Sequence, residues 1–255
     1  MKLKNFSLMT RYNLFSLLIL VFALFVIYFF YNKSRSGIVL YGRAIFSESD
    51  DLKVAVPYWV ANQVEKGNKE KSAFGGTTAE VIEVESYEGG SHGKHLVLEL
   101  KLFVQKDRED NYFYKGQSLE LNKWVNFNFG KFKHRGFITY LSLKPSKFKK
   151  KQVLLTVAKD NELPFIAKEF KPNDVMLNNK GEVMAKIISV NLVPTTLNTE
   201  ARSNVEISVE VTAKDIYGID YFTEISKIKT GENINLFFKN VILWDGLITS
   251  VEEKS

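Results

Sequence analysis

"LELKLFV" (98–104) and "VEISVEV" (205–211) are the two stretches that decide the fold, because each alternates apolar residues with polar or mixed ones. Alternation with a period of two puts one set of side chains on one face of an extended chain, which is the signal of a half-buried β-strand. Aligned from their first residues, the two stretches place Glu99 on Glu206. The chain is therefore predicted to contain the same strand twice.

Other blocks repeat in the same order and with nearly the same spacing, which indicates an internal duplication. "AEVIEV" (79–84) aligns with "AKIISV" (185–190), and "GFITYLS" (136–142) aligns with "GLITSVE" (246–252). Continuing the alignment of the two central strands also matches Tyr114 with Tyr221, Leu121 with Ile228 and Asn126 with Asn233. We infer two diverged copies, one over residues 38–143 and one over residues 153–252.

Each copy is predicted to be a small, mainly β domain, built as a sandwich or a barrel, because its strands are short and separated by turn signals. The mixed stretches 50–68 and 161–174 each leave room for one short helix. Asp50 and Asn161 are the expected N-caps, and Pro57 limits the first helix. The alternation does not distinguish a sandwich from a barrel.

The composition is that of a globular protein, with 45% apolar and 25% charged residues in 255 positions. The absence of cysteine excludes disulfides, thiolate metal sites and cysteine nucleophiles. The three histidines are His92, His95 and His134, so a metal site built from imidazoles would need nearly all of them. The sequence predicts no cofactor.

Residues 14–31, "LFSLLILVFALFVIYFFY", carry no charge and would span about 27 Å as a helix. This run exceeds the usual apolar core of a signal peptide, and "NKSRSG" (32–37) follows it in place of a cleavage site. An uncleaved transmembrane helix is therefore predicted. Basic residues are balanced on its two sides, so the usual arrangement of a signal anchor sets the orientation, with the N-terminus in the cytoplasm and the β domains outside it.

These predictions divide the chain into successive segments, and the lipid bilayer becomes its first expected partner. The segments are a short tail (1–13), a transmembrane helix (14–31), a juxtamembrane linker (32–37), the first β domain (38–143), a lysine-rich linker (144–152), the second β domain (153–252) and a tail (253–255).

Positive charge is concentrated between residues 131 and 151, which hold eight of the 35 basic residues and no acidic one. The remaining 27 basic residues face 29 acidic ones, so this stretch accounts for the net charge of +6. Two interpretations stay open, a solvated linker or a patch that contacts a partner or binds an anionic lipid or polysaccharide. Nucleic acid is not an expected partner, because the domains are predicted to lie outside the cytoplasm. The candidate contact residues are Lys131, Lys133, Arg135, Lys144, Lys147, Lys149, Lys150 and Lys151.

The loop "YEGGSHGKH" (87–95) brings His92 and His95 close to Glu88 in the sequence. A stable zinc site needs at least three protein ligands, so this loop is interpreted as an exposed hairpin tip. No nucleophile elbow, HExxH motif or phosphate-binding glycine pattern occurs. The protein is expected not to be an enzyme, and no catalytic, cofactor-binding or metal-binding residue is predicted.

Short motifs recur at matching places in the two copies. "VEKGN" (64–68) and "FKPND" (170–174) each precede an alanine-led strand, a long alternating strand and a glycine-led closing strand. With the single N-terminal span, this order resembles a family of bacterial single-pass membrane proteins catalogued only as a domain of unknown function. The resemblance covers most of residues 10–252 and implies an envelope protein without known catalytic residues. The stretch 46–78 departs from the pattern, which indicates an insertion for interaction.

Three functions follow as hypotheses. The leading one is a non-enzymatic, membrane-anchored bacterial envelope protein whose tandem β domains bind or scaffold a protein partner or a second copy in an assembly. The alternative is a lipid- or glycan-handling module, similar to the anchored β-barrel domains of bacterial lipid transport, and "LFFKNVILW" (236–244) has the adjacent apolar residues expected of one. A hydrolase of cell-wall polymer is the third.

Overall fold

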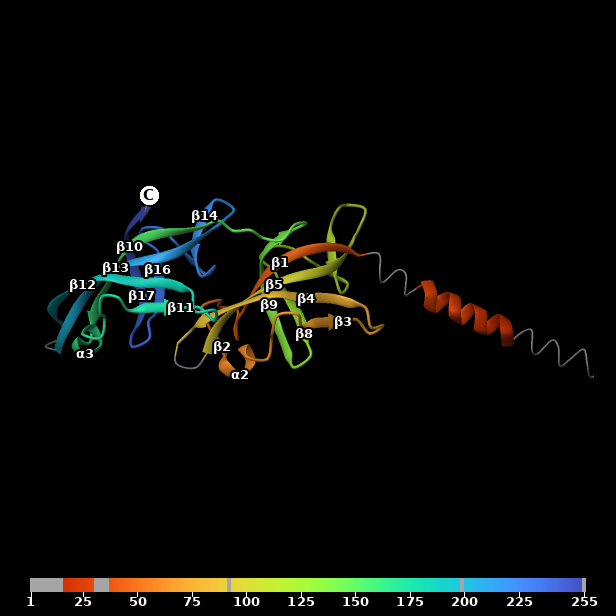
Figure 1. Cartoon of the computed structure of the whole chain (residues 1–255), viewed down its shortest axis with the longest axis horizontal. Coiled ribbons are helices and arrows are strands. Elements are labelled where there is room, and N and C mark those ends of the chain that lie inside the picture. The colour runs from red at the N-terminus through yellow and green to blue at the C-terminus, as the bar shows by residue number, and fades with distance from the viewer. Residues whose placement is uncertain (1–15, 30–36, 91–92, 198–199, 254–255) are drawn as a thin grey trace, which may run out of the picture.

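The computed structural model describes residues 16–29, 37–90, 93–197 and 200–253 (Figure 1). Apart from a helix over residues 16–29, the described chain forms two curled antiparallel sheets that follow one another along the long axis of the molecule. We call strands β1–β9 the first unit and strands β10–β17 the second unit. The predicted mainly β fold is confirmed.

The first unit has the strand order β3-β4-β5-β1-β9-β8, with β2 and β6 paired to β5 and β7 paired to β6. A four-residue helix, α2, packs near β5. The elements are β1 (Ile38–Phe46), β2 (Val56–Pro57), α2 (Tyr58–Ala61), β3 (Lys69–Lys71), β4 (Thr77–Glu88), β5 (Gly93–Lys106), β6 (Tyr112–Tyr114), β7 (Gln117–Ser118), β8 (Trp124–Phe129) and β9 (Phe132–Ser142).

The second unit has the strand order β11-β12-β13-β10-β17-β16, with β14 paired to β13 and β15 paired to β14. A second four-residue helix, α3, packs near β13. The elements are β10 (Lys150–Glu162), α3 (Pro164–Ala167), β11 (Val175–Leu177), β12 (Val183–Leu197), β13 (Glu200–Ile216), β14 (Ile219–Phe222), β15 (Ser226–Lys227), β16 (Asn233–Phe237) and β17 (Ile242–Glu253).

The two strand orders become identical when β1 is matched with β10, β4 with β12 and β5 with β13. This is the arrangement that the predicted tandem repeat requires. The turns before β4 and β12 also match, because Gly67 bonds to the carbonyl of Val81 at 2.8 Å and Asn173 bonds to the carbonyl of Ile187 at 2.8 Å. The predicted alignment of 79–84 with 185–190 is therefore confirmed.

The closing strands of the two units share a β-bulge. The pairing register slips by one residue at Thr139 in β9 and at Thr249 in β17. The Thr139 hydroxyl donates to the carbonyl of Arg43 at 3.4 Å, and the Thr249 hydroxyl donates to the carbonyl of Thr156 at 3.2 Å. A bulge bends its strand and increases the local twist, which helps the sheet to curl. The predicted alignment of 136–142 with 246–252 is confirmed by this shared irregularity.

The predicted alignment of the two central strands is wrong by two residues. Leu100 in β5 pairs with Val81, and Val209 in β13 pairs with Ile187, so Leu100 corresponds to Val209 and not to Ile207. An alignment displaced by two residues keeps every side chain on its own face, so alternation alone does not detect the error. The register and loop bonds of the following strands match Tyr114 with Phe222, Leu119 with Ile228 and Asn126 with Asn235.

The glycine that leads each closing strand lies against the core. A Cβ atom on Gly136 would lie 2.8 Å from the Phe46 ring, and one on Gly246 would lie 2.6 Å from the Val157 side chain. Real Cβ contacts are longer than this, so glycine is required for Phe46 and its neighbours to pack at this position.

Both predicted short helices are present, but their predicted N-caps are wrong. Helix α2 starts after Pro57, and α3 starts after Leu163 with Pro164 in its first turn. Neither helix has a side-chain cap. Pro164 lies at the first helical position of α3, where its fixed φ angle suits a helix and its missing N–H leaves no donor unsatisfied. In α2 the N-cap is Pro57 itself, so neither helix uses the side chain of Asp50 or Asn161.

The predicted transmembrane helix is not supported by the described residues. Within the span 14–31, residues 16–29 form a helix with exposed apolar side chains, and positions 14, 15, 30 and 31 lie outside the described residues. In the part of the chain that the structure describes, no helix combines the length and apolarity needed to cross a membrane.

Candidate functional site

The end of the β4–β5 hairpin inserts into the second unit. Tyr87 is 3% exposed and belongs to the apolar core of the second unit, although its strand belongs to the first. Its hydroxyl donates to the carbonyl of Thr223 at 3.0 Å, and its ring stacks on His95 with the ring centroids 5.2 Å apart. Burial is the main reason why the pKa of Tyr87 is raised. The hairpin thus fixes one unit against the other, and we call this contact the joint.

The turn between β11 and β12 covers the outer edge of β4. The Asn179 backbone N–H donates to the carbonyl of Ser86 at 2.7 Å, and the Ser86 N–H donates to the Asn179 side chain at 3.0 Å. The Asn179 amide also donates to the carbonyl of Val84 at 3.2 Å. At the tip, Lys180 forms an ion pair with Glu83. The turn therefore acts as a short additional strand.

Beside this turn, five charged side chains are buried where the units meet. The first unit supplies Arg43, Glu85 and Glu99, and the second supplies Lys214 and Glu224; each is at most 9% exposed. The Lys214 ammonium lies 2.6 Å from Glu85 and 2.9 Å from Glu224. We call this group the charge cluster.

Arg43 completes the charge cluster from the side of β1. Its guanidinium donates to Glu85 at 3.0 Å and to Glu224 at 3.1 Å, and it lies 3.6 Å from Glu99. Burial would raise the pKa of Glu85, but the charges and hydrogen bonds of Lys214 and Arg43 outweigh burial and hold that pKa below its usual value. Glu85 therefore serves the joint as an ionised partner of the two cations.

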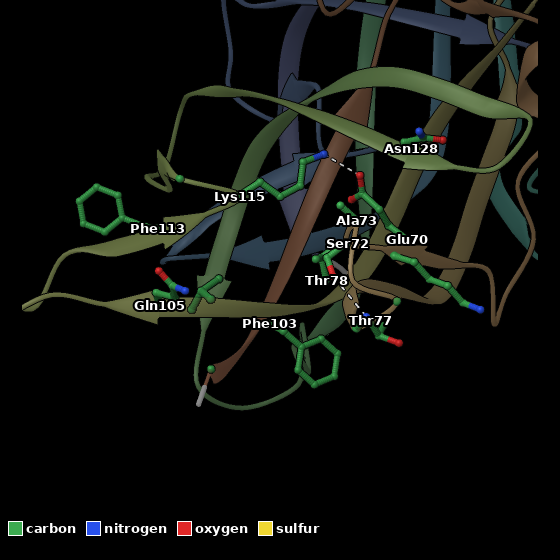
Figure 2. A pocket seen from close by; sticks show the side chains of 16 residues that line it. Glu70, Ser72, Ala73, Thr77, Thr78, Phe103, Gln105, Phe113, Lys115 and Asn128 are labelled. Atoms are coloured by element: carbon green, nitrogen blue, oxygen red, sulfur yellow. Dashed lines mark hydrogen bonds and ion pairs between the residues drawn. The ribbon is translucent and has the colours of Figure 1, made fainter. Parts of the chain in front are cut away.

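An open cavity of about 960 Å³ lies in the first unit beside the turn after β3 (Figure 2), and β3 is on the side of this unit away from the second unit (Figure 1). Figure 2 shows Lys115 reaching toward Glu70, with Phe103, Gln105 and Phe113 on the neighbouring strands. The Lys115 ammonium lies 2.6 Å from the Glu70 carboxylate. We call this cavity the socket; its walls are the β3–β4 turn (71–78), the end of β5 (103–105) and the β6–β7 turn (113–116).

The socket is the counterpart of the surface on the second unit that holds Tyr87. Ser72 bonds to the carbonyl of Gly76 at 2.7 Å, as Asn178 bonds to the carbonyl of Glu182 at 3.0 Å, and Gly75 and Gly181 have φ angles of +80° and +78°. The β6–β7 turn of the socket also matches its counterpart, since Lys115 and Gly116 have positive φ angles, as Thr223 and Glu224 do in the second unit. Thr223 and Glu224 are buried by the joint, whereas Lys115 and Gly116 are exposed.

The predicted basic residues form two separate groups. Lys131, Lys133 and Arg135 lie at the start of β9 and the other five lie beyond its end; an 11-residue strand spans about 33 Å, which keeps the groups apart. Arg135 contacts Asp50 at 2.6 Å and lies 4.8 Å from the centre of the Trp124 ring.

The second basic group lies near the joint. Lys144, Lys147 and Lys149 are exposed in the connector, while Lys150 and Lys151 belong to β10 and not to a linker. Lys147 and Lys150 line a cavity of about 310 Å³ together with members of the charge cluster. Lys150 lies 3.4 Å from Glu182, and Lys151 lies 2.8 Å from Asp220.

The predicted exposed position of His95 is wrong, because this side chain is 4% exposed and lies between Tyr87 and Phe237. Burial lowers the pKa of His95 to about 4. His92 lies outside the described residues. The described part of the chain contains no group of three or more side chains arranged to hold a metal ion.

Comparison with protein-family models, curated proteins and solved structures finds no match for this chain. The resemblance to a family of single-pass membrane proteins therefore rests on the sequence motifs alone.

Sequence reasoning missed the charge cluster and the socket. Arg43 and Glu99 are direct neighbours on adjacent strands, but this is visible only once the register is known. The polar face of "LELKLFV" looks like a solvent-facing side. Glu99 on this face is buried where the second unit packs, whereas Lys101 and Phe103 farther along the strand are half-exposed. The one available signal was the number of charged residues in strongly β-forming segments.

Replacing Lys214 with methionine is expected to lower the free energy of unfolding by about 3 kcal/mol, because it leaves Glu85 and Glu224 buried without their ammonium partner. Denaturant titration of the full chain measures this change. Lys150→Met is the matched control, since its partner Glu182 is exposed and such pairs contribute about 0–1 kcal/mol. Equal losses in both variants would contradict a buried, structural role for the cluster.

The stability of the joint is expected to fall between pH 6.5 and pH 4. The folded protein holds His95 neutral down to about pH 4, whereas the unfolded chain takes up its proton near pH 6.5. His95 contributes fully above pH 6.5, and up to about 3 kcal/mol is lost as the pH falls to 4. Denaturation of His95→Phe at several pH values should show a weaker dependence than the unmodified chain. His134→Phe, at a half-exposed position, is the control for replacing an imidazole by an apolar ring, and equal effects of the two replacements would contradict the assignment to His95.

Proposed function

We propose that the protein is a non-enzymatic, membrane-anchored bacterial envelope protein that uses its two β units as one rigid scaffold and its socket as the docking site for a protein partner. The single observation that carries the proposal is the match between the socket and the surface that holds Tyr87. Where this surface occurs in the second unit, a β-hairpin fills it. In the first unit the same surface is open to solvent.

The walls of the socket suit an extended backbone with apolar side chains. The counterpart turn binds β4 through backbone and amide hydrogen bonds, and added strands of this kind are a common mode of peptide recognition. Phe103 and Phe113 supply apolar area, while Lys115 and Glu70 supply charge. Glu70 is buried and also accepts a hydrogen bond from Tyr114, which fixes its position in the wall.

The anchor belongs to the proposal on sequence grounds. Residues 14–31 are uncharged, and the helix over 16–29 exposes apolar side chains such as Leu18 and Phe22 on every side. Exposed apolar surface of this extent is unusual for a protein in water and is stable in a bilayer. A signal anchor usually has a short N-terminal tail in the cytoplasm and its large domain on the other side of the membrane, so the proposal has the β units outside the cytoplasm.

A lipid- or glycan-handling role is the second candidate, and one groove favours it. A cavity of about 940 Å³ lies against the second unit, where Phe165, Leu177, Phe238 and Trp244 line it, and Glu88 and Gly90 of the first unit border it. Phe165 is 66% exposed and Trp244 is 45% exposed. Exposed aromatic rings in a groove offer stacking and apolar contact to a sugar or an acyl chain.

A hydrolase of cell-wall polymer is the third candidate, and the same groove would hold its carboxylates. Glu88, Glu162 and Glu169 line the groove. Glu88 accepts a hydrogen bond from Tyr58, Glu162 accepts one from the backbone of Leu163, and Glu169 lies 3.4 Å from the Lys171 ammonium. These partners give each carboxylate a structural role, which is why this function ranks last.

The docking proposal predicts a specific cross-link in native membranes. A photoreactive phenylalanine analogue at position 105, in the wall of the socket, is expected to form a covalent adduct with a protein, detected by a mass shift on a denaturing gel and identified by peptide mass spectrometry. Position 133 on β9 is the comparison, because Lys133 is also exposed but lies outside the socket. An adduct at position 133 with none at position 105 would transfer the partner site to the basic stretch.

The proposed orientation predicts which cysteine variant a membrane-impermeant maleimide labels. The chain has no cysteine, so a single replacement reports alone. Lys239→Cys, exposed in the second unit, should be labelled in intact spheroplasts, and Ser7→Cys in the N-terminal tail should be labelled only after lysis. The reverse pattern would place the β units in the cytoplasm.

A further inference from the structure

The outer edge of β12 is uncovered where the corresponding edge of β4 is covered. In the first unit, β3 pairs with β4 as far as Glu80, and the turn of the second unit then covers Val84 to Tyr87. In the second unit, β11 pairs with β12 as far as Lys186. Ile187, the next residue, forms backbone hydrogen bonds with Asn173 and Asp174 in the turn before β11. Among the described residues, no strand pairs with that side of β12 after Ile187.

Burial at matched positions shows the same difference. Ser86 and Tyr87 are 6% and 3% exposed, whereas their counterparts Leu192 and Val193 are 36% and 51% exposed. Ile188 on the same strand is 45% exposed. An apolar strand edge with free backbone groups is a template for pairing with another chain. This edge therefore has the properties of an interface that lacks its partner in the single chain.

The residues at both free surfaces differ from their counterparts at the joint. Where the units meet, Lys180 at the tip of the turn pairs with Glu83 on the edge. At the corresponding free positions, the tip carries Phe74, which is 72% exposed, and the edge carries Ser189 beside exposed Ile188. The ion pair of the joint thus corresponds to apolar or neutral residues on both free surfaces, which makes these surfaces compatible with each other.

The positions that match the charge cluster show the same difference. On the edge side, the counterparts of Arg43, Glu85 and Glu99 are uncharged, and on the turn side so are those of Lys214 and Glu224. If one of these positions still carried a charge, docking would bury that charge without a partner, which costs much free energy. The counterparts are Thr156, Asn191 and Ser208 on the edge side and Gln105 and Gly116 on the turn side.

We propose that a second copy of this chain is the partner, and that the copies join head to tail. The edge of β12 of one copy, over residues 188–193, enters the socket of the next and repeats the joint between the units of a single chain. Val193 takes the place of Tyr87, and Phe74 packs on Ile188. Such a contact joins two different surfaces, so it generates an open chain or a ring.

The contact between copies is weaker than the joint within a chain. Ala73 stands where Asn179 makes two side-chain hydrogen bonds to the β4 edge, and an alanine makes neither. Assembly is therefore reversible and depends on local concentration, which an anchor in the plane of a membrane raises. This inference rests on the proposal that the socket docks a protein, and it identifies that protein.

Disulfide trapping tests the contact directly. Tyr87 and Asn178 form an antiparallel bridge across the joint, so their counterparts Val193 and Ser72 should lie about 5 Å apart between copies, within reach of a disulfide. Full-length Ser72→Cys and Val193→Cys chains, purified separately in detergent and mixed under mild oxidation, should give a mixed dimer. Val183→Cys, on the same strand at an exposed position outside the contact, is the control partner.

A charge exchange adds a rescue experiment. Phe74→Lys should weaken association at least tenfold in sedimentation of the full chain, and Ser189→Glu on the other copy should restore it, because the pair recreates Lys180 and Glu83. Failure of both the mixed disulfide and the rescue overturns head-to-tail assembly, as does equal trapping with Val183→Cys. If the socket then cross-links a different protein in native membranes, docking stands without self-assembly; if it cross-links none, both proposals fail.

Discussion

The Lys214 ammonium lies between Glu85 of the first unit and Glu224 of the second, and the arrangement of the whole molecule depends on this shared cation. Removing these charges from water is costly, and only close pairing offsets the cost. The pairing requires the units to meet in one orientation, because Arg43 must reach the same two carboxylates from another strand. The insertion of Tyr87 buries apolar surface beside the charge cluster. The cluster thus sets the orientation of the two units, and the neighbouring apolar contact helps to hold them together.

The duplication is visible in the sequence because both units keep the same buried positions. Alternation in "LELKLFV" and "VEISVEV" identifies the central strands, and the glycine-led blocks identify the closing strands with the correct spacing. The central strands were matched two residues out of place, since period-two patterns repeat after every second residue. Only the partners of Leu100 and Val209 resolve this, and they lie on other strands.

The joint was not predictable by the same reasoning. Glu85, Glu99 and Lys214 look like solvent-facing residues, because strand alternation assumes that one face of a sheet meets water. In this molecule the second unit covers part of that face. His95 shows the same limitation: its place in a glycine-rich loop indicated exposure, whereas it belongs to β5 and packs between Tyr87 and Phe237. The residues that join the two units are those at which the two copies differ. Aligning the copies by their similar residues therefore does not identify them.

The joint also has a mechanical consequence. The two units lie end to end, with the helix over residues 16–29 beyond the first unit and the β12–β13 hairpin at the far end of the second (Figure 1). Tyr87, Asn179 and the charge cluster immobilise the junction by side-chain insertion, strand addition and ion pairing at once. The units therefore behave as one stiff lever. A load applied at the distal hairpin is carried to the base of the molecule as torque, without being absorbed by bending between the units.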